Sequence, residues 1–207
     1  MSPRTFERFG GLCAILAGLT GLLYAVAFVI VSRRAPVLGG TLSALFLTLL
    51  GLFSTAALAA LFDRTREAAR GFAVWGFVLA IAGAIGSTAH GGYDLANAIH
   101  PPEAVLDLPN AVDPRGLLTF GFTGLGILVL AGLSSRAGFS DAFRYLGYLL
   151  GLLLIVIYLA RLILLDPANP ILLVPVLVSG FVVNPLWYLW LGVSLWRGPM
   201  ERMKAEG

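Results

Sequence analysis

Six long apolar stretches, separated by short polar segments, dominate the pattern of hydrophobic and polar residues along the chain. The stretches are continuously apolar and do not alternate between apolar and polar positions, which excludes the strands of a transmembrane β-barrel. A helix needs about 20 apolar residues to cross the ~30 Å core of a bilayer, and each stretch is of this order. The pattern therefore predicts six transmembrane helices, over residues 10–32, 37–62, 71–99, 116–134, 145–165 and 171–196.

The composition agrees with a membrane protein and excludes most other classes. Hydrophobic residues make up 58% of the 207 residues and charged residues 12%, about half the charge of an average soluble domain. A soluble domain, a disordered chain and a disulfide-stabilised secreted module are excluded on these grounds. Cys13 is the single cysteine, so we expect neither an intrachain disulfide nor a cysteine metal site. The predicted fold class is all-α: a polytopic transmembrane bundle of six helices that forms one domain over residues 1–207.

The first apolar stretch has some features of a cleaved signal peptide. Arg4 and Arg8 precede it, and the sequence from Ala25 to Ala27 resembles a cleavage site. The apolar run nevertheless continues to Val31, and its length suits a full span. We therefore expect it to be retained as the first helix.

Basic residues lie unevenly on the two sides of the predicted bundle. Ten lie on one side: Arg4, Arg8, Arg64, Arg66, Arg70, Arg136, Arg144, Arg197, Arg202 and Lys204. Arg33, Arg34 and Arg115 lie on the other side, and Arg161 lies within the fifth span. The positive-inside rule then predicts that both termini are cytoplasmic. These charges are expected to anchor the protein to lipid headgroups, and no nucleic-acid partner is expected. Thirteen arginines against one lysine favour a GC-rich bacterial genome and thus the inner (plasma) membrane.

Two features of the spans concern helix packing. The third span carries a stripe of small residues from Gly76 to Gly91, which predicts close packing at the centre of the bundle. The sixth span contains Asn184 and Pro185 near the bilayer midplane, where the proline frees a backbone carbonyl and is expected to kink the helix. Asn184 is interpreted either as an interhelical hydrogen-bonding residue or as part of a hinge or midplane ligand contact.

A cluster of polar residues is predicted in the outer part of the membrane. One face of the third helix carries His90, Tyr93, Asp94 and Asn97, at helical spacing, and the fifth helix contributes Tyr158 and Arg161. Intramembrane charges are costly and mark functional candidates. Counting from the cytoplasmic arginines places the two groups at a similar depth, so we expect an ion pair between Asp94 and Arg161.

The chemistry open to this cluster is limited. Two histidines, with no cysteine beside them in the cluster, provide too few ligands for a metal, and no cofactor is expected. Ser87, His90 and Asp94 all lie on one helix, which is poor geometry for a catalytic triad, so no catalytic residue is assigned. The cluster is therefore either a structural ion pair or a ligand site. The ligand hypothesis predicts a cavity between the third, fifth and sixth helices, lined by His90, Tyr93, Asn97 and Tyr158, reachable through the loop 100–115 and holding a neutral or weakly polar molecule.

The chain resembles a large group of bacterial six-helix integral membrane proteins of uncharacterised activity. The resemblance rests on the six spans, the polar second loop at residues 62–67 and the aromatic closing helix at residues 185–196. It implies a six-helix bundle and assigns no site residue.

Three functions are consistent with these features. The first is binding of a small molecule or lipid in an outer-leaflet polar pocket, as in a sensor or transporter. The second is a non-catalytic accessory subunit with a membrane-protein partner. The third is an intramembrane enzyme acting on a lipid-like substrate, for which the sequence offers no convincing nucleophile.

Overall fold

The computed structural model describes residues 3–101, 116–164, 166 and 169–198, and these residues form helices without any strand. Within them, six helices are long and apolar enough to cross a membrane: Arg4–Arg34, Pro36–Thr65, Arg70–Ile99, Leu117–Ala137, Asp141–Leu164 and Pro170–Arg197. The prediction of six spans in an all-α fold is confirmed. The observed helices extend up to six residues beyond the predicted ends, because the flanking charged residues continue the helix without interrupting its backbone.

Three spans are regular α-helices, namely α3 (Pro36–Thr65), α4 (Arg70–Ile99) and α7 (Asp141–Leu164). Each of the others contains one π-helical segment. The first span runs through α1 (Pro3–Val26), η1 (Ala27–Val31) and α2 (Ser32–Arg34). The fourth consists of η2 (Leu117–Phe122), α6 (Thr123–Ser134) and the 3₁₀ turn η3 (Ser135–Ala137). The sixth runs through α8 (Pro170–Val178), η4 (Ser179–Val183) and α9 (Asn184–Arg197).

The ends of several helices follow from local sequence. Pro36 and Pro170 occupy the first turns of α3 and α8, where a missing N–H is not needed. The Asn169 side chain caps α8 by accepting a hydrogen bond of 3.0 Å from the Ile171 N–H. Gly138 has a φ of 83°, and this left-handed conformation turns the chain between η3 and α7.

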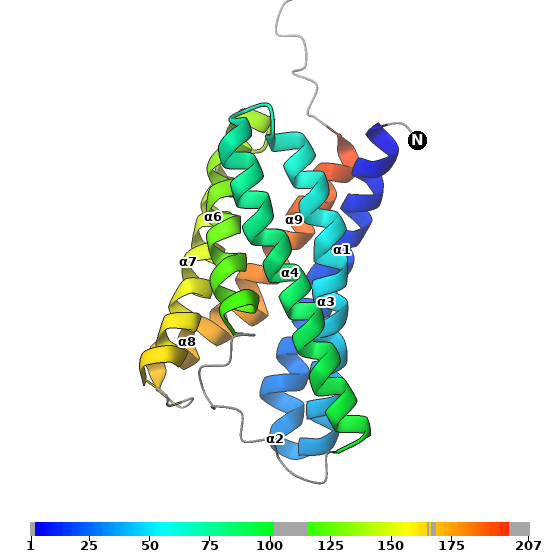
Figure 1. Cartoon of the computed structure of the whole chain (residues 1–207), viewed down its shortest axis with the longest axis vertical. Helices are drawn as coiled ribbons and strands as arrows, with labels where there is room; N and C mark the ends of the chain where they lie inside the picture. The colour runs from blue at the N-terminus through cyan, green and yellow to red at the C-terminus, as the bar shows by residue number, and fades with distance from the viewer. Residues whose placement is uncertain (1–2, 102–115, 165, 167–168, 199–207) are drawn as a thin grey trace, which may run out of the picture.

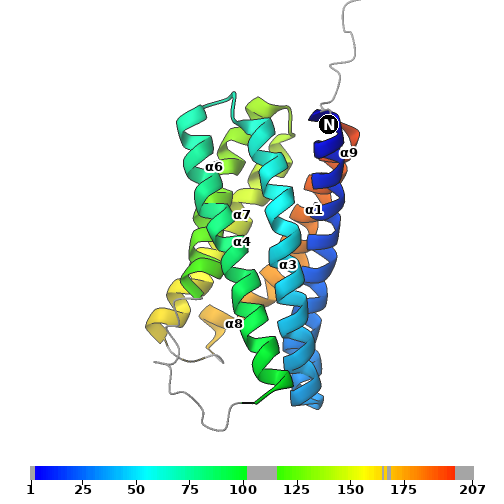
Figure 2. The same ribbon diagram turned by 45° about the vertical axis from the view of Figure 1, so that its right-hand side comes forward.

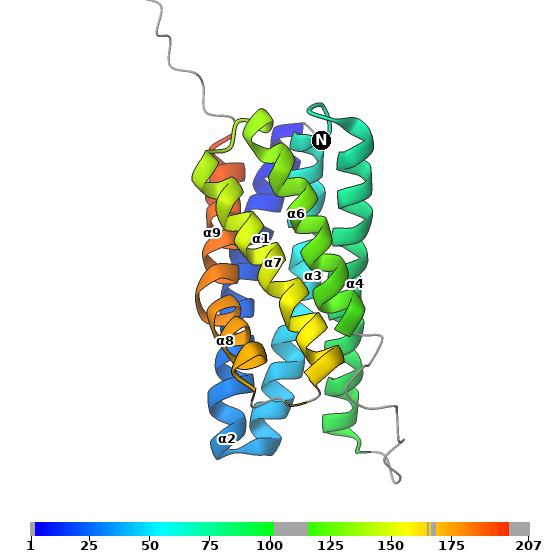
Figure 3. The same ribbon diagram turned by 90° about the vertical axis from the view of Figure 1, so that its left-hand side faces the viewer.

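The six spans form a closed ring in which each neighbour in sequence is also a neighbour in space (Figures 1, 2 and 3). The most extensive contacts are between α3 and α4, between α1 and α3, and between α1 and α9. The sixth span closes the ring by packing on the first. The start of α1 and the end of α9 lie at the same end of the bundle (Figure 1); we call this the terminal end.

Small residues allow α3 and α4 to approach closely. A Cβ atom built on Gly51 would lie 2.5 Å from the backbone oxygen of Ala84, and one on Gly91 would lie 2.6 Å from that of Ala44. The stripe of small residues predicted in the third span is buried, as close packing requires. These two helices are therefore in near backbone contact over much of their length.

A buried ion pair closes the terminal end of the bundle. Arg64 of α3 contacts the Glu7 carboxylate of α1 at 3.1 Å, with 7% and 17% of the two side chains exposed. Its Nη1 donates to the backbone oxygen of Ser194 in α9 at 3.2 Å, and its guanidinium lies 5.1 Å from the ring centre of Phe139. Arg64 was predicted to lie in the polar second loop. It lies instead in the last turn of α3, and Glu7 supplies the counterion that allows its side chain to be buried.

Candidate functional site

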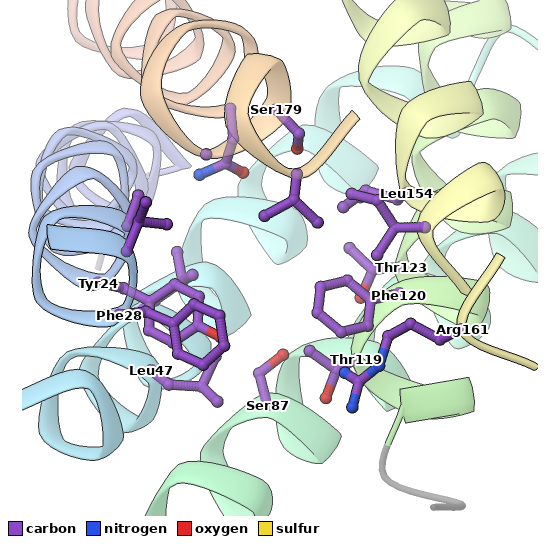
Figure 4. Close-up of a pocket in the computed structure, with 18 of the residues that line it drawn as sticks. Tyr24, Phe28, Leu47, Ser87, Thr119, Phe120, Thr123, Leu154, Arg161 and Ser179 are labelled. Atoms are coloured by element: carbon purple, nitrogen blue, oxygen red, sulfur yellow. The ribbon is translucent and has the colours of Figure 1, made fainter. Parts of the chain in front are cut away.

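A cavity of about 400 Å³ lies between the spans in the half of the bundle away from the terminal end. Figure 4 shows Tyr24 and Phe28 on one side of it, Phe120 and Arg161 on the opposite side, and Ser87 between them. Its volume is within the range of pockets that hold a drug-sized ligand. The described side chains and backbone thus leave room for a molecule much larger than water.

The cavity wall is mainly apolar, with polar groups at intervals. Leucine side chains from two helices contribute to it, Leu47 and Leu50 from α3 and Leu154 from α7. Hydroxyl or amide groups come from Tyr24, Ser54, Ser87, Thr119, Thr123, Ser179, Asn184 and Tyr188, and positive charge comes from Arg33 and Arg161. An apolar wall with a few polar groups is the usual construction of a small-molecule site.

All three π-helical segments of the described chain border this cavity. Phe28 and Val29 belong to η1, Thr119 and Phe120 to η2, and Ser179 and Gly180 to η4. These segments come from the first, fourth and sixth spans, so their meeting at one place does not follow from their order in sequence. Single π turns inside helices occur frequently at functional sites, since they displace side chains from regular helical positions.

Side chains next to two of the π segments help to stabilise them. The Ser32 hydroxyl donates to the Ala27 carbonyl five residues earlier at 3.0 Å, and the Thr123 hydroxyl donates to the Leu118 carbonyl at 3.4 Å. The Ala27 carbonyl also accepts the backbone N–H of Ser32, so the hydroxyl adds a second donor to the hydrogen bond that closes the π turn. Pro185, which has no N–H, is the second residue after the end of the third segment.

The six predicted ligand-binding residues do not all line the cavity. Arg161 lines the cavity. His90 lies behind the wall, with its Nδ1 3.4 Å from the Thr119 hydroxyl and its Nε2 3.3 Å from the Asp94 carboxylate. Tyr93, Asn97 and Tyr158 are not among the lining residues, and Tyr93 is exposed on α4. The predicted loop 100–115 lies outside the described residues beyond Pro101.

Asp94 and Arg161 are not joined to each other in the part of the chain that the structure describes. Asp94 pairs with His90 one turn earlier on α4, and the Arg161 guanidinium lies 5.9 Å from the ring centre of Phe120. The expectation of an ion pair was wrong here, because equal depth in the membrane does not place two side chains on facing sides of their helices. Arg161 instead turns to the cavity (Figure 4).

Asn184 lines the cavity and Pro185 is buried beside it. The Asn184 amide nitrogen also packs against Gly21, where an added Cβ would lie only 2.5 Å away. Sequence reasoning missed Tyr24, Phe28 and Arg33, since the two aromatic residues are ordinary members of an apolar run and Arg33 reads as an anchor at the end of a span. The hydroxyl residues Ser32 and Thr123 were the available signal for irregular helices.

The contacts of Ser87 argue against its use as a nucleophile in this arrangement. Its hydroxyl donates to the Gly83 carbonyl at 3.0 Å, whereas His90 contacts Thr119 and Asp94. Ser87, His90 and Asp94 therefore do not form the chain of hydrogen bonds that activates a serine. Among the described residues, no group of three His, Cys, Asp or Glu side chains could hold a metal ion.

No family model, curated protein or solved structure matches this chain.

Proposed function

We propose that this protein is a multi-pass membrane protein that binds a small molecule or a lipid in the cavity between its six spans, as a sensor or a transporter does. The observation that carries the proposal is the meeting of three π segments, from three different spans, around one cavity. A bundle that needed only close packing would have no use for irregular helices at one place, and the tight α3–α4 contact shows how regular helices pack in this chain.

The binding proposal is tested by filling the cavity. Ser87 points into it (Figure 4), so Ser87→Phe should place a ring in the space that a ligand would use. Ile85→Phe is the matched control, because Ile85 is on the same helix but is 58% exposed and so faces away from the interior of the bundle. Small molecules and lipids extracted from each purified protein are identified by mass spectrometry.

We expect a defined molecule to accompany the wild-type protein and the Ile85→Phe variant and to be lost from Ser87→Phe. The same set of molecules in all three proteins would overturn the proposal, provided that Ser87→Phe elutes as a folded protein in size-exclusion chromatography.

The proposal includes an orientation. Ten basic residues on the side of the termini against three on the other side support cytoplasmic termini in a bacterial inner membrane, with the cavity in the outer half. Reporter fusions that distinguish the two sides of the membrane test this orientation. A fusion at Gly207 should report the cytoplasm, and an insertion between residues 101 and 109 should report the outer side. An external reporter at Gly207 would contradict the orientation.

A further inference from the structure

The charges on the cavity wall are of one sign. Arg33 and Arg161 line it, and no aspartate or glutamate is among the described lining residues. The ion pairs found among the described residues involve other arginines, namely Arg64, Arg66 and Arg144, and the Asp94 carboxylate lies 3.3 Å from the His90 ring. The expectation of a neutral ligand depended on Asp94 neutralising Arg161, and Asp94 pairs with His90 instead.

The two arginines lie toward one part of the cavity and the aliphatic side chains toward the other. Arg33 ends the first span, on the side away from the terminal end, and Arg161 lies in the last turn of α7, which ends on the same side. Leu47 and Leu50 come from the middle part of α3, deeper in the bundle. The cavity is thus cationic near the end of the bundle, whereas its deeper part is lined by leucines together with the uncharged polar side chains of Ser54, Asn184 and Tyr188.

We infer that the ligand is an amphiphile with a single alkyl chain and an anionic head group, a carboxylate or a phosphate monoester. The inference rests on the proposed function and names the chemical class of the ligand. The head group would contact Arg33 and Arg161, and the alkyl chain would lie along Leu47, Leu50 and Leu154. A cavity of about 400 Å³ suits one chain better than an intact two-chain phospholipid.

The physical reason is the cost of a charge in an apolar surrounding. This cost applies to Arg161, which is partly buried within α7, whereas Arg33 is exposed at the end of the first span. A guanidinium within a bilayer is costly unless it has a counterion or reaches water. Its planar donors match carboxylate and phosphate oxygens, with which it forms charge-assisted and often bidentate hydrogen bonds. The face of Phe120 provides Arg161 with a cation–π contact at 5.9 Å but with no hydrogen-bond acceptor in the ring plane. An anionic head group would supply that acceptor.

Binding of four probes to the full-length protein in a neutral detergent tests the inference, with the bound mass read by native mass spectrometry. The probes are dodecyl phosphate, dodecanoate, dodecanol and inorganic phosphate. Dodecyl phosphate and dodecanoate should bind at least about tenfold more tightly than dodecanol, the equivalent of about 1.4 kcal/mol. Inorganic phosphate, which has no chain, should bind more weakly than dodecyl phosphate.

Variants separate the two arginines from general charge effects. Arg33→Gln and Arg161→Gln should each weaken dodecyl phosphate binding about tenfold and leave dodecanol binding unchanged. Arg34→Gln is the matched control, since Arg34 is the neighbour of Arg33 and does not line the cavity. Arg161→Lys should retain much of the affinity for dodecyl phosphate, which shows whether a loss in Arg161→Gln comes from charge or from misfolding.

Equal binding of dodecanol and dodecyl phosphate to the wild-type protein would overturn the inference, as would an equal loss in Arg34→Gln and Arg33→Gln. The proposed function would survive either result, because it depends on the difference between Ser87→Phe and Ile85→Phe. If that difference is absent, the cavity is not a binding site and the proposed function fails with it.

Discussion

Arg64 and Arg161 both lie inside apolar spans, but their side chains have different partners. Arg64, near the terminal end, has a carboxylate at 3.1 Å, a backbone oxygen at 3.2 Å and an aromatic ring beside it, all supplied by the chain. Arg161 has the ring of Phe120 and otherwise turns toward a cavity. The Arg64 charge joins three helices, whereas the Arg161 charge lines the cavity and contacts one aromatic ring.

The packing of the helices around the two arginines also differs. Near Arg64, α1, α3 and α9 are drawn together by one side chain, and regular helices pack closely. Near Arg161, the π segments of three spans and the regular helices α3, α4 and α7 together enclose a space. In one half of the molecule a buried charge joins the helices, and in the other half the helices enclose a cavity.

The largest effect is expected from breaking the Arg64 contact. Glu7→Leu would leave Arg64 buried without its carboxylate, and we expect the free energy of unfolding to fall by about 3–5 kcal/mol. Adding Arg64→Met should recover much of this loss, because the stranded charge is then removed. Denaturant unfolding in detergent measures both effects.

The control for this prediction is Asp63→Asn. It breaks the Arg66–Asp63 pair, whose side chains are 52% and 41% exposed. Exposed pairs contribute about 0–1 kcal/mol. A loss in Glu7→Leu no larger than that in Asp63→Asn would show that the terminal end does not depend on its buried pair.

An intermediate effect is expected from the α3–α4 contact. Gly91→Ala would place a Cβ 2.6 Å from the Ala44 oxygen, and relieving this clash should cost about 1–3 kcal/mol of stability. Gly92→Ala is the control, since nothing lies within 4 Å of its Cβ and alanine favours a helix. Thermal unfolding compares the two variants. If both unfold at the same temperature, the close approach of these helices is not needed.

The smallest effect is expected between Asp94 and Arg161. A double-mutant cycle with Asp94→Asn and Arg161→Gln should give a coupling energy below about 0.5 kcal/mol, because the two side chains are not in contact. The same cycle on Glu7 and Arg64 should give a coupling several times larger. A coupling above about 1 kcal/mol for Asp94 and Arg161 would mean that they form the pair first expected from the sequence.

The sequence was a good guide to the spans, because the length of an apolar run is a local property and the bilayer fixes the length required. It was a poor guide to Arg64, because the partner Glu7 is 57 residues away along the chain. A charged residue at the end of an apolar run resembles a loop residue unless the side chain that neutralises it is known.

The sequence predicted only part of the candidate site, and the reason is related. Arg161 stood out as an intramembrane charge, and Asn184 as a polar residue near the midplane. Counting residues gave their depth, but depth does not tell which way a side chain points around its helix. That direction decided that Asp94 pairs with His90 and that Tyr24 and Phe28, apolar by pattern, form one wall of the cavity.

The π segments also determine how the rest of each helix is oriented. Every residue of an α-helix advances the side chains by about 100°, so one additional residue in a π turn rotates everything after it by that angle. In the sixth span, η4 therefore sets the phase of α9, including the face that presents Trp187 to the core and Trp190 outward. A one-residue deletion within η4 would shift that phase and exchange buried for exposed positions along α9, whereas a substitution there would leave it unchanged.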